Sequence, residues 1–254
     1  ADSLATGSIA AGGTLGILIP PSVILIIYGL LTEADIGKLF IAGIIPGLLG
    51  VLFYLGAIYV TVLLKPDLAP TASEDMKLEK RDVWGVLAVV GLFAVIMIGI
   101  YGGFFTPTEA AGMGAGAAVV IALALRTMSL AGFVSAVLDS ARTTAMIFVI
   151  VIGAEMFTNF INFAGLPDAL ASLVSDWGLA PWMVIAAIIV IYLILGCVLE
   201  SLSMVLLTVP VFYPLMFELD FTNSLLHDPE NALIWFAIVV VVATEISLIT
   251  PPVG

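Results

Sequence analysis

The sequence is poor in charged residues and contains very few of the side chains that most often build chemical sites. Only 10% of its 254 residues are charged, whereas 62% are hydrophobic. A soluble domain needs more polar surface than this, so the composition predicts that lipid surrounds much of the chain. The formal net charge is −12, but the acidic residues are concentrated in the predicted loops, so the charge indicates little about partners.

The chain has one cysteine, Cys197, and one histidine, His227. This excludes an intramolecular disulfide and leaves no cysteine or histidine cluster for zinc or an iron–sulfur centre. His227 falls in a polar loop, where a solvated histidine is the usual case. The sequence also lacks an HExxH motif and an intramembrane aspartate pair. We therefore predict that the protein is not an enzyme and needs no cofactor.

Long apolar runs are abundant, and their pattern indicates helices. A bilayer core of roughly 30 Å needs about 20 apolar residues in helical form. The runs at 83–105 and 182–195 are apolar on every face, unlike the alternating pattern of a membrane barrel. Because backbone groups in lipid must be satisfied within helices or closed barrels, the sequence predicts an all-α polytopic membrane protein.

The basic residues indicate how the chain is oriented. Four of the seven lie in the hydrophilic stretch 65–82, which the positive-inside rule places in the cytoplasm. Counting spans from there gives this predicted organisation: a first broken helix at 1–31, a connecting span at 32–64, a cytoplasmic loop at 65–82, three spans with a cytoplasmic amphipathic helix (130–140) at 83–163, an outer amphipathic segment at 164–180, a re-entrant hairpin at 181–217, and a second, truncated broken helix at 231–254. Since neither an initiator methionine nor a signal peptide precedes Ala1, we expect an internal portion of a longer protein.

The hairpin is predicted from length. Residues 181–217 are apolar except for a polar centre at 200–203, and they are too few for two full crossings and a turn. A segment that enters to mid-membrane, turns near 200–203 and returns fits this length.

Two Pro-Pro pairs interrupt apolar segments near the two ends of the chain, at 20–21 and 251–252. Proline lacks a backbone donor and clashes with the preceding turn, so each pair frees main-chain carbonyls. Such carbonyls suit a dehydrated cation, and the N-terminus of a half-helix suits an anion. The two segments run in opposite directions through the membrane, which is the inverted-repeat pattern of secondary transporters. The alternative is a pair of kinks that only shape packing.

Other polar residues at membrane depth have both a functional and a structural interpretation. Glu155, Asn159 and Asn162 form one helical stripe, which can serve transport or hold helices together. Glu245 flanks the second Pro-Pro pair and is expected to shape that site. Thr106 is predicted to cap the helix that follows it.

Six motifs recur in a recognisable combination: GSIAAGGTLGILIPPS at 7–22, FIAGIIPGLL at 40–49, GGFFTPTEAA at 102–111, SARTTAM at 140–146, LTVPVFYPL at 207–215 and EISLITPPVG at 245–254. Together they resemble the large membrane subunit of tripartite ATP-independent periplasmic (TRAP) transporters, the DctM family. The resemblance extends over essentially the whole chain.

This resemblance implies an elevator-type carrier, in which a transport domain of two hairpins and two broken helices moves against a scaffold. It implies Na⁺ as the coupling ion, uptake of a C4-dicarboxylate or related carboxylate, and a multi-pass location in the bacterial inner membrane. It also implies two protein partners, a small TRAP membrane subunit and a periplasmic substrate-binding protein, and no nucleic acid.

The breaks and the resemblance together predict the following sites. The first Na⁺ site contains Gly13, Thr14, Pro20 and Ser22, and the second contains Ser201, Ser203, Thr250 and Pro251. The residues expected at the substrate are Gly16, Glu200, Ser247 and Pro252. Another secondary carrier or a channel of the same inverted-repeat architecture stays open as an alternative, and an intramembrane enzyme is the least favoured.

Overall fold

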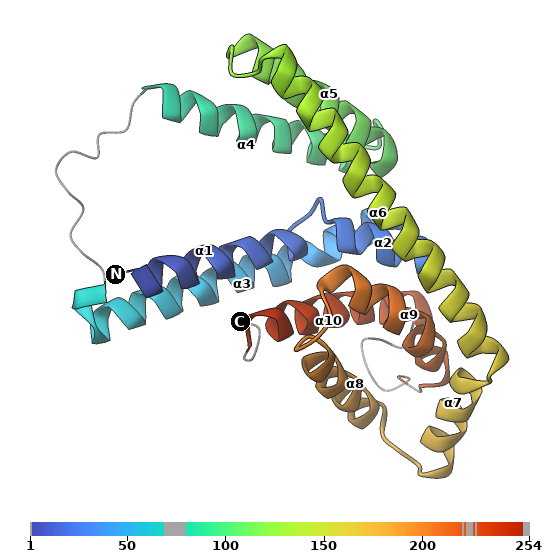
Figure 1. Cartoon of the computed structure of the whole chain (residues 1–254). Coiled ribbons are helices and arrows are strands. Elements are labelled where there is room, and N and C mark those ends of the chain that lie inside the picture. Colours follow the sequence, from blue (N-terminus) through green and yellow to red (C-terminus); the bar gives the residue numbers. More distant parts are fainter. Residues whose placement is uncertain (1, 69–79, 220, 222–225, 227, 251–254) are drawn as a thin grey trace. The chain divides into compact units, whose positions relative to one another are not determined.

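The computed structural model describes residues 2–68, 80–219, 221, 226 and 228–250, and every regular element in these ranges is helical (Figure 1). In chain order the elements are α1 (Asp2–Leu18), α2 (Val23–Thr32), α3 (Ile36–Leu64), the short 3₁₀ helix η1 (Pro66–Leu68), α4 (Lys80–Tyr101), α5 (Pro107–Ala124), α6 (Leu130–Phe163), α7 (Leu166–Asp176), α8 (Pro181–Leu195), α9 (Ser201–Glu218) and α10 (Pro229–Ile249). Within the described residues, seven helical segments are long and apolar enough to cross a membrane, with α1 and α2 counted as one. The predicted all-α polytopic membrane fold is confirmed.

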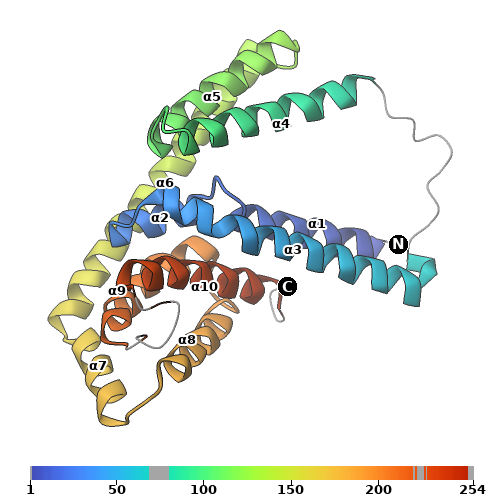
Figure 2. The same cartoon turned by 180° about the vertical axis from the view of Figure 1, so that it is seen from behind.

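The chain divides into two compact units, residues 1–69 with 149–254 and residues 70–148. The first unit is built around α10, which contacts α1, α2, α3, α8 and α9. Figure 2 shows α1 lying alongside α3. Phe236, Val240 and Val241 of α10 have no exposed surface. A helix that is apolar on every face is expected at such a central position.

Tyrosine hydroxyls join the helices of the first unit at three points. Tyr28 of α2 donates to the Leu233 carbonyl of α10 at 3.0 Å, and Tyr213 of α9 donates to the Thr32 carbonyl at 3.1 Å. Tyr192 of α8 bonds to Thr208 of α9. Buried tyrosines normally find such partners because an unpaired hydroxyl in an apolar core is costly.

The second unit contains α4, α5 and the first part of α6. Helices α4 and α5 pack against each other. At the start of α5, the Glu109 amide donates to Thr106 Oγ1 at 3.3 Å, and the Thr106 amide donates to Glu109 Oε2 at 2.8 Å. This reciprocal pair is a capping box, so the predicted capping role of Thr106 is confirmed.

Two helices are longer than the local sequence suggests. Helix α1 is continuous from Asp2 to Leu18 although it contains Gly12, Gly13 and Gly16. A glycine weakens a helix by only about 1 kcal/mol, which neighbouring helices can offset. The predicted separate amphipathic helix at 130–140 was wrong: it belongs to the single 34-residue helix α6, which contains no proline that could end it.

The turn of the predicted hairpin lies slightly earlier than expected. The non-helical residues are 196–200, and α9 begins at Ser201. Serine and glutamate tolerate the first turn of a helix well, and Glu200 caps it. We call residues 19–22 the first break and residues 196–200 the hairpin turn.

Candidate ion and substrate site

The first break separates α1 from α2 because Pro20 and Pro21 cannot donate to the carbonyls of Gly16 and Ile17, four residues earlier. Ser22, which is 1% exposed, replaces one of the missing donors, since its hydroxyl donates to the Ile17 carbonyl. The same oxygen accepts from the Leu25 amide at 3.3 Å and caps α2. The hydroxyl predicted as a cation ligand thus already joins the two half-helices. The carbonyl of Gly16 lacks its usual helical donor.

Two glycines of α3 allow the first break to approach closely. A Cβ built at Gly43 would lie 3.0 Å from the Leu18 carbonyl oxygen, and one built at Gly47 would lie 3.0 Å from Cγ1 of Ile19. The pair forms a Gly-x-x-x-Gly pattern, which commonly marks close backbone approach between membrane helices. Sequence reasoning missed both residues, although this spacing was available as a signal.

The residues predicted for the first cation site do not all gather at the break. Pro20 and Ser22 are buried there. Gly13 and Gly16 lie on an exposed face of α1, and a Cβ at either would meet no described atom within 4 Å. Thr14 is half-buried, and its hydroxyl donates to the Ala11 carbonyl at 3.0 Å. The structure therefore brings Pro20 and Ser22 together at the break. Thr14 lies nearer the N-terminus of α1, where it lines a separate pocket.

Glu200 organises the hairpin turn. Its Oε1 accepts from both the amide and the hydroxyl of Ser203 at 2.8 Å, and its Oε2 accepts from the Leu202 amide at 3.3 Å. A carboxylate at this position satisfies the free amides of α9 and complements the helix dipole. Ser201, next to it, is buried at 8% exposure. An anionic substrate at this helix end would have to displace the Glu200 carboxylate.

The end of α10 meets the hairpin turn. Ser247 has no exposed surface, and its hydroxyl donates to the Thr244 carbonyl at 2.6 Å. A Cβ built at Gly196, the first residue of the turn, would overlap the Ser247 side chain. Thr250 caps α10 and donates to the Ser247 carbonyl at 2.9 Å. The hairpin turn and the residues before the second Pro-Pro pair are thus in direct contact.

Some predicted residues lie outside the described ranges, namely His227, Pro251 and Pro252. Sequence reasoning did not select Gly196, for which a glycine at the end of a short apolar segment was the available signal. Thr244 is fully buried, and its hydroxyl has no hydrogen-bond partner within the described residues. It adds an uncommitted oxygen beside Ser247.

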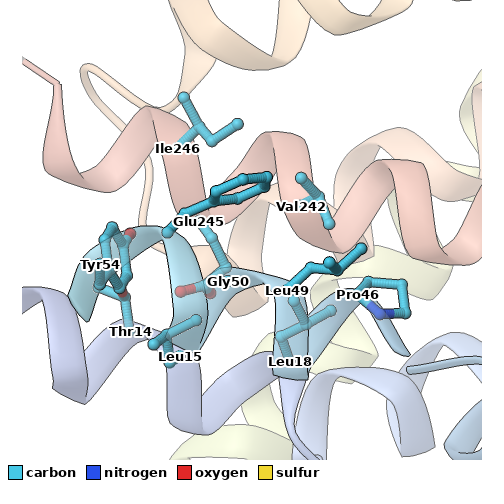
Figure 3. A pocket seen from close by; sticks show the side chains of 11 residues that line it. Thr14, Leu15, Leu18, Pro46, Leu49, Gly50, Tyr54, Val242, Glu245 and Ile246 are labelled. Atoms are coloured by element: carbon cyan, nitrogen blue, oxygen red, sulfur yellow. The ribbon is translucent and has the colours of Figure 1, made fainter. Parts of the chain in front are cut away.

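A pocket of about 320 Å³ lies between α1, α3 and α10 (Figure 3). Its wall is largely apolar and includes Leu15, Leu18 and Val242, with Thr14 and Glu245 as polar members. Figure 3 shows Glu245 extending from α10 towards α1. Glu245 was expected to shape the site at the second Pro-Pro pair; the structure places its side chain in this separate pocket instead.

The fold and the two interruptions around α10 define a multi-pass helical membrane protein with broken segments of the kind that secondary transporters use. The sequence profile of the family described as "Tripartite ATP-independent periplasmic transporter, DctM component" matches residues 1–254. The chain belongs to this family.

Curated relatives agree with this assignment. The chain is 38% identical over 252 residues to the C4-dicarboxylate TRAP transporter large permease protein DctM of Pseudomonas aeruginosa, covering 98% of this chain and 56% of the relative. It is 32% identical over 257 residues to the sialic acid TRAP transporter large permease protein SiaM of Vibrio cholerae, covering 100% of this chain and 57% of the relative. The ectoine/5-hydroxyectoine large permease protein UehC of Ruegeria pomeroyi is 30% identical over 255 residues, with 100% and 57% coverage. The chain thus spans little more than half the length of these relatives, which are transporter permeases and not enzymes.

Proposed function

We propose that this chain forms the central part of a TRAP large permease that imports an organic acid together with Na⁺. One observation carries the proposal: the helices on both sides of the first break and of the hairpin turn all contact α10. Two interruptions that share one helix can present their free polar groups to the same ligand region. This is the arrangement expected for a substrate site built from broken helices.

The oxygen atoms near the two interruptions support the choice of Na⁺ as the coupling ion. Hard cations prefer carbonyl and hydroxyl oxygens, and the Gly16 carbonyl lacks its helical donor at the first break. On α10, three residues before the Ser247 that meets the hairpin turn, the Thr244 hydroxyl has no hydrogen-bond partner within the described residues. We therefore keep two Na⁺ sites in the proposal, with the second drawing on Thr244 as well as on Ser201, Ser203 and Thr250.

The names of the relatives guide the choice of substrate. They include transporters for C4-dicarboxylates, sialic acid and 2,3-diketo-L-gulonate. All three solutes are acids, and a C4-dicarboxylate is the proposal because that relative is 38% identical. The first unit has only Lys38 and Lys65 as basic residues, so helix N-termini and bound Na⁺ would meet the negative charge.

The proposal includes the assembly and its location. A small TRAP membrane subunit and a periplasmic binding protein would complete the transporter in the bacterial inner membrane. The movement would be of the elevator type, with α8 as one leg of a re-entrant hairpin. Its 15 residues span about 22 Å, less than the roughly 30 Å of a bilayer core.

Transport by the complete, purified three-component system in proteoliposomes tests this function. We expect uptake of labelled C4-dicarboxylate to require the binding protein and to collapse when Na⁺ is replaced by choline. Equal uptake in choline would exclude Na⁺ coupling. Flux without the binding protein, saturating only at very high substrate, would favour a channel.

A further inference from the structure

A groove of about 320 Å³ lies between α4 and α5, within the second unit. The two helices run antiparallel, so that the start of α4 lies beside the end of α5 (Figure 1). We call it the α4–α5 groove, and the side chains that line it are all apolar: Trp84, Leu87, Ala88, Ile121, Ala124 and Leu125. The proposed ion and substrate site does not use this groove, because the residues of that site all belong to the first unit.

The α4–α5 groove opens to the surface of the helix pair. Trp84 is 66% exposed, Leu87 54% and Leu125 46%. Both helices are long and apolar enough to cross a membrane, so the medium around their exposed apolar faces is lipid. An acyl chain suits such a groove, because it fills apolar space and has no polar atoms to satisfy.

Basic residues lie at the end of the helix pair where the groove is found. Residues 77–82 read KLEKRD, with three basic and two acidic residues. Arg126 directly follows Leu125 of the groove, and no acidic residue stands between Glu109 and Asp139. The positive-inside rule places this end in the cytoplasm. Anionic lipids of the cytoplasmic leaflet are attracted to basic positions of this kind.

Trp84 indicates the depth of the groove in the bilayer. Tryptophan is enriched at the membrane interface, where its amphipathic ring lies at the level of the headgroups. Trp84 stands one helical turn after Lys80, the first residue of α4. The groove therefore begins at the level where a phospholipid joins its phosphate to its acyl chains.

Arg126 occupies a backbone position that glycine usually fills. Its φ is 54°, in the left-handed region, and Leu125 before it is the C-cap of α5. The Arg126 amide donates to the Leu123 carbonyl at 3.0 Å, and the Thr127 amide donates to the Ala122 carbonyl at 2.9 Å, which is the Schellman ending of a helix. A residue with a Cβ is disfavoured at this position. Complementing the helix dipole does not require it, since a basic residue in the last turn would serve equally.

The Arg126 side chain is also exposed, and it forms no ion pair with any residue that the structure describes. A guanidinium group presents several donors in one plane and matches the oxygens of a phosphate. An uncommitted arginine thus stands beside an apolar groove, at the depth of the headgroups.

We propose that the α4–α5 groove binds an anionic phospholipid of the cytoplasmic leaflet. One acyl chain lies in the groove, and Arg126 binds the phosphate. The excess of basic residues at this end favours a headgroup with net negative charge over a zwitterionic one. This inference goes beyond the proposed function, which gives the second unit no ligand.

Fluorescence quenching in vesicles tests the proposal. The full-length permease is reconstituted into equal amounts of phosphatidylglycerol and phosphatidylcholine, with brominated acyl chains on one lipid or the other. The difference between the wild type and Trp84→Phe isolates the quenching of Trp84. We expect brominated phosphatidylglycerol to quench Trp84 about twofold or more as strongly as brominated phosphatidylcholine.

Two results in the wild type would overturn the proposal. Equal quenching by the two lipids would mean that the groove holds ordinary surrounding lipid without selection. No quenching by either lipid would mean that protein covers the groove, whether another part of the permease, a partner subunit or a second copy.

Arg126→Gly separates lipid binding from folding. Glycine suits the left-handed position, so this variant should unfold at the same temperature as the wild type or a higher one, and its Trp84 should be quenched equally by both lipids. The matched control is Arg142→Gln, because Arg142 lies on α6 of the same unit and pairs with Asp139 at 3.4 Å. The control should keep the preference for phosphatidylglycerol, and a preference that survives in Arg126→Gly would contradict the proposed role of Arg126.

A second variant keeps the test open if Trp84→Phe fails to fold. Ala124→Phe fills the groove from an exposed position and leaves Trp84 and Arg126 in place. Native mass spectrometry of the purified permease should then show one phosphatidylglycerol fewer than in the wild type. An unchanged number of bound lipids would show that the acyl chain does not lie in the groove.

Discussion

The first break and the hairpin turn interrupt apolar segments in different ways. At the first break, the Ser22 hydroxyl is used twice, on the Ile17 carbonyl and the Leu25 amide, and Gly43 and Gly47 bring α3 against it. At the hairpin turn, Gly196 meets Ser247 of α10, and the nearby Thr244 hydroxyl is buried with no hydrogen-bond partner among the residues that the structure describes. The side-chain hydroxyl at the first break is thus used in the break's own contacts, whereas the region of the hairpin turn keeps a side-chain hydroxyl available for a ligand.

The largest effect is expected where the hairpin turn touches α10. Gly196→Val forces a branched side chain into the space of Ser247, and overpacking of this kind costs about 1–3 kcal/mol or more. We expect loss of transport and a clearly lower unfolding temperature of the full-length protein in detergent.

Two variants control this prediction. Gly56 lies in α3, and a Cβ built there would meet no described atom within 4 Å. The Gly56→Val variant should therefore leave transport unchanged. Adding Ser247→Gly to Gly196→Ala should recover part of the stability lost in Gly196→Ala alone. Equal stability of Gly196→Val and Gly56→Val would show that the two helices do not meet at this point.

A somewhat smaller effect is expected at the first break. Gly43→Ala places a Cβ 3.0 Å from the Leu18 carbonyl oxygen, which a shift of a few tenths of an ångström can relieve. We expect a loss of about 1–2 kcal/mol in thermal unfolding, with Gly56→Ala as the control. Gly56→Ala should be neutral or stabilising by up to about 1 kcal/mol, because alanine favours a helix. A stabilising Gly43→Ala would remove the argument that α3 packs closely on the break.

The two serines sharpen the comparison between structural and ligand-binding hydroxyls. Ser22→Ala removes a helix cap, which costs about 0.5–2 kcal/mol, and we expect it to leave the Na⁺ concentration for half-maximal uptake little changed. Ser201→Ala should instead raise that concentration by about fivefold to tenfold, the equivalent of one lost ligand bond, with little loss of stability. The reverse pattern in unfolding and uptake assays would show that the Ser22 hydroxyl, and not that of Ser201, ligates a cation.

Much of the fold followed from the sequence because lipid imposes simple rules. The apolar lengths predicted the spans, and Pro20-Pro21 predicted the first break at the observed place. Single prolines behaved differently: Pro46, Pro210 and Pro214 all lie inside helices. In each of these helices neighbouring turns remain bonded, whereas two prolines in succession remove consecutive donors.

The contacts of the site could be predicted from the sequence much less well than the fold, because they depend on which helices meet. Glu245 and Ser247 are two residues apart, yet one faces the pocket with Thr14 and the other meets Gly196. A helix turns by about 100° per residue, so neighbours in sequence face different partners. The role of a hydroxyl was also hard to predict from the sequence. Ser22 and Thr14 are of residue types that often ligate cations, but each donates to a nearby carbonyl of its own segment.

The smallest effects concern one tyrosine in each interrupted segment: Tyr28 of α2, which bonds to α10, and Tyr192 of α8, which bonds to α9 across the hairpin. Without the Tyr28 hydroxyl, the Leu233 carbonyl still accepts the backbone hydrogen bond of its own helix, α10. Without the Tyr192 hydroxyl, Thr208 still donates to the Met204 carbonyl. Each Tyr→Phe variant should therefore cost only about 0.5–1.5 kcal/mol in thermal unfolding. If the two segments respond independently, the double variant adds the two losses within about 0.5 kcal/mol. A larger coupling energy would mean that α10, which both segments contact, transmits a change at one interruption to the other.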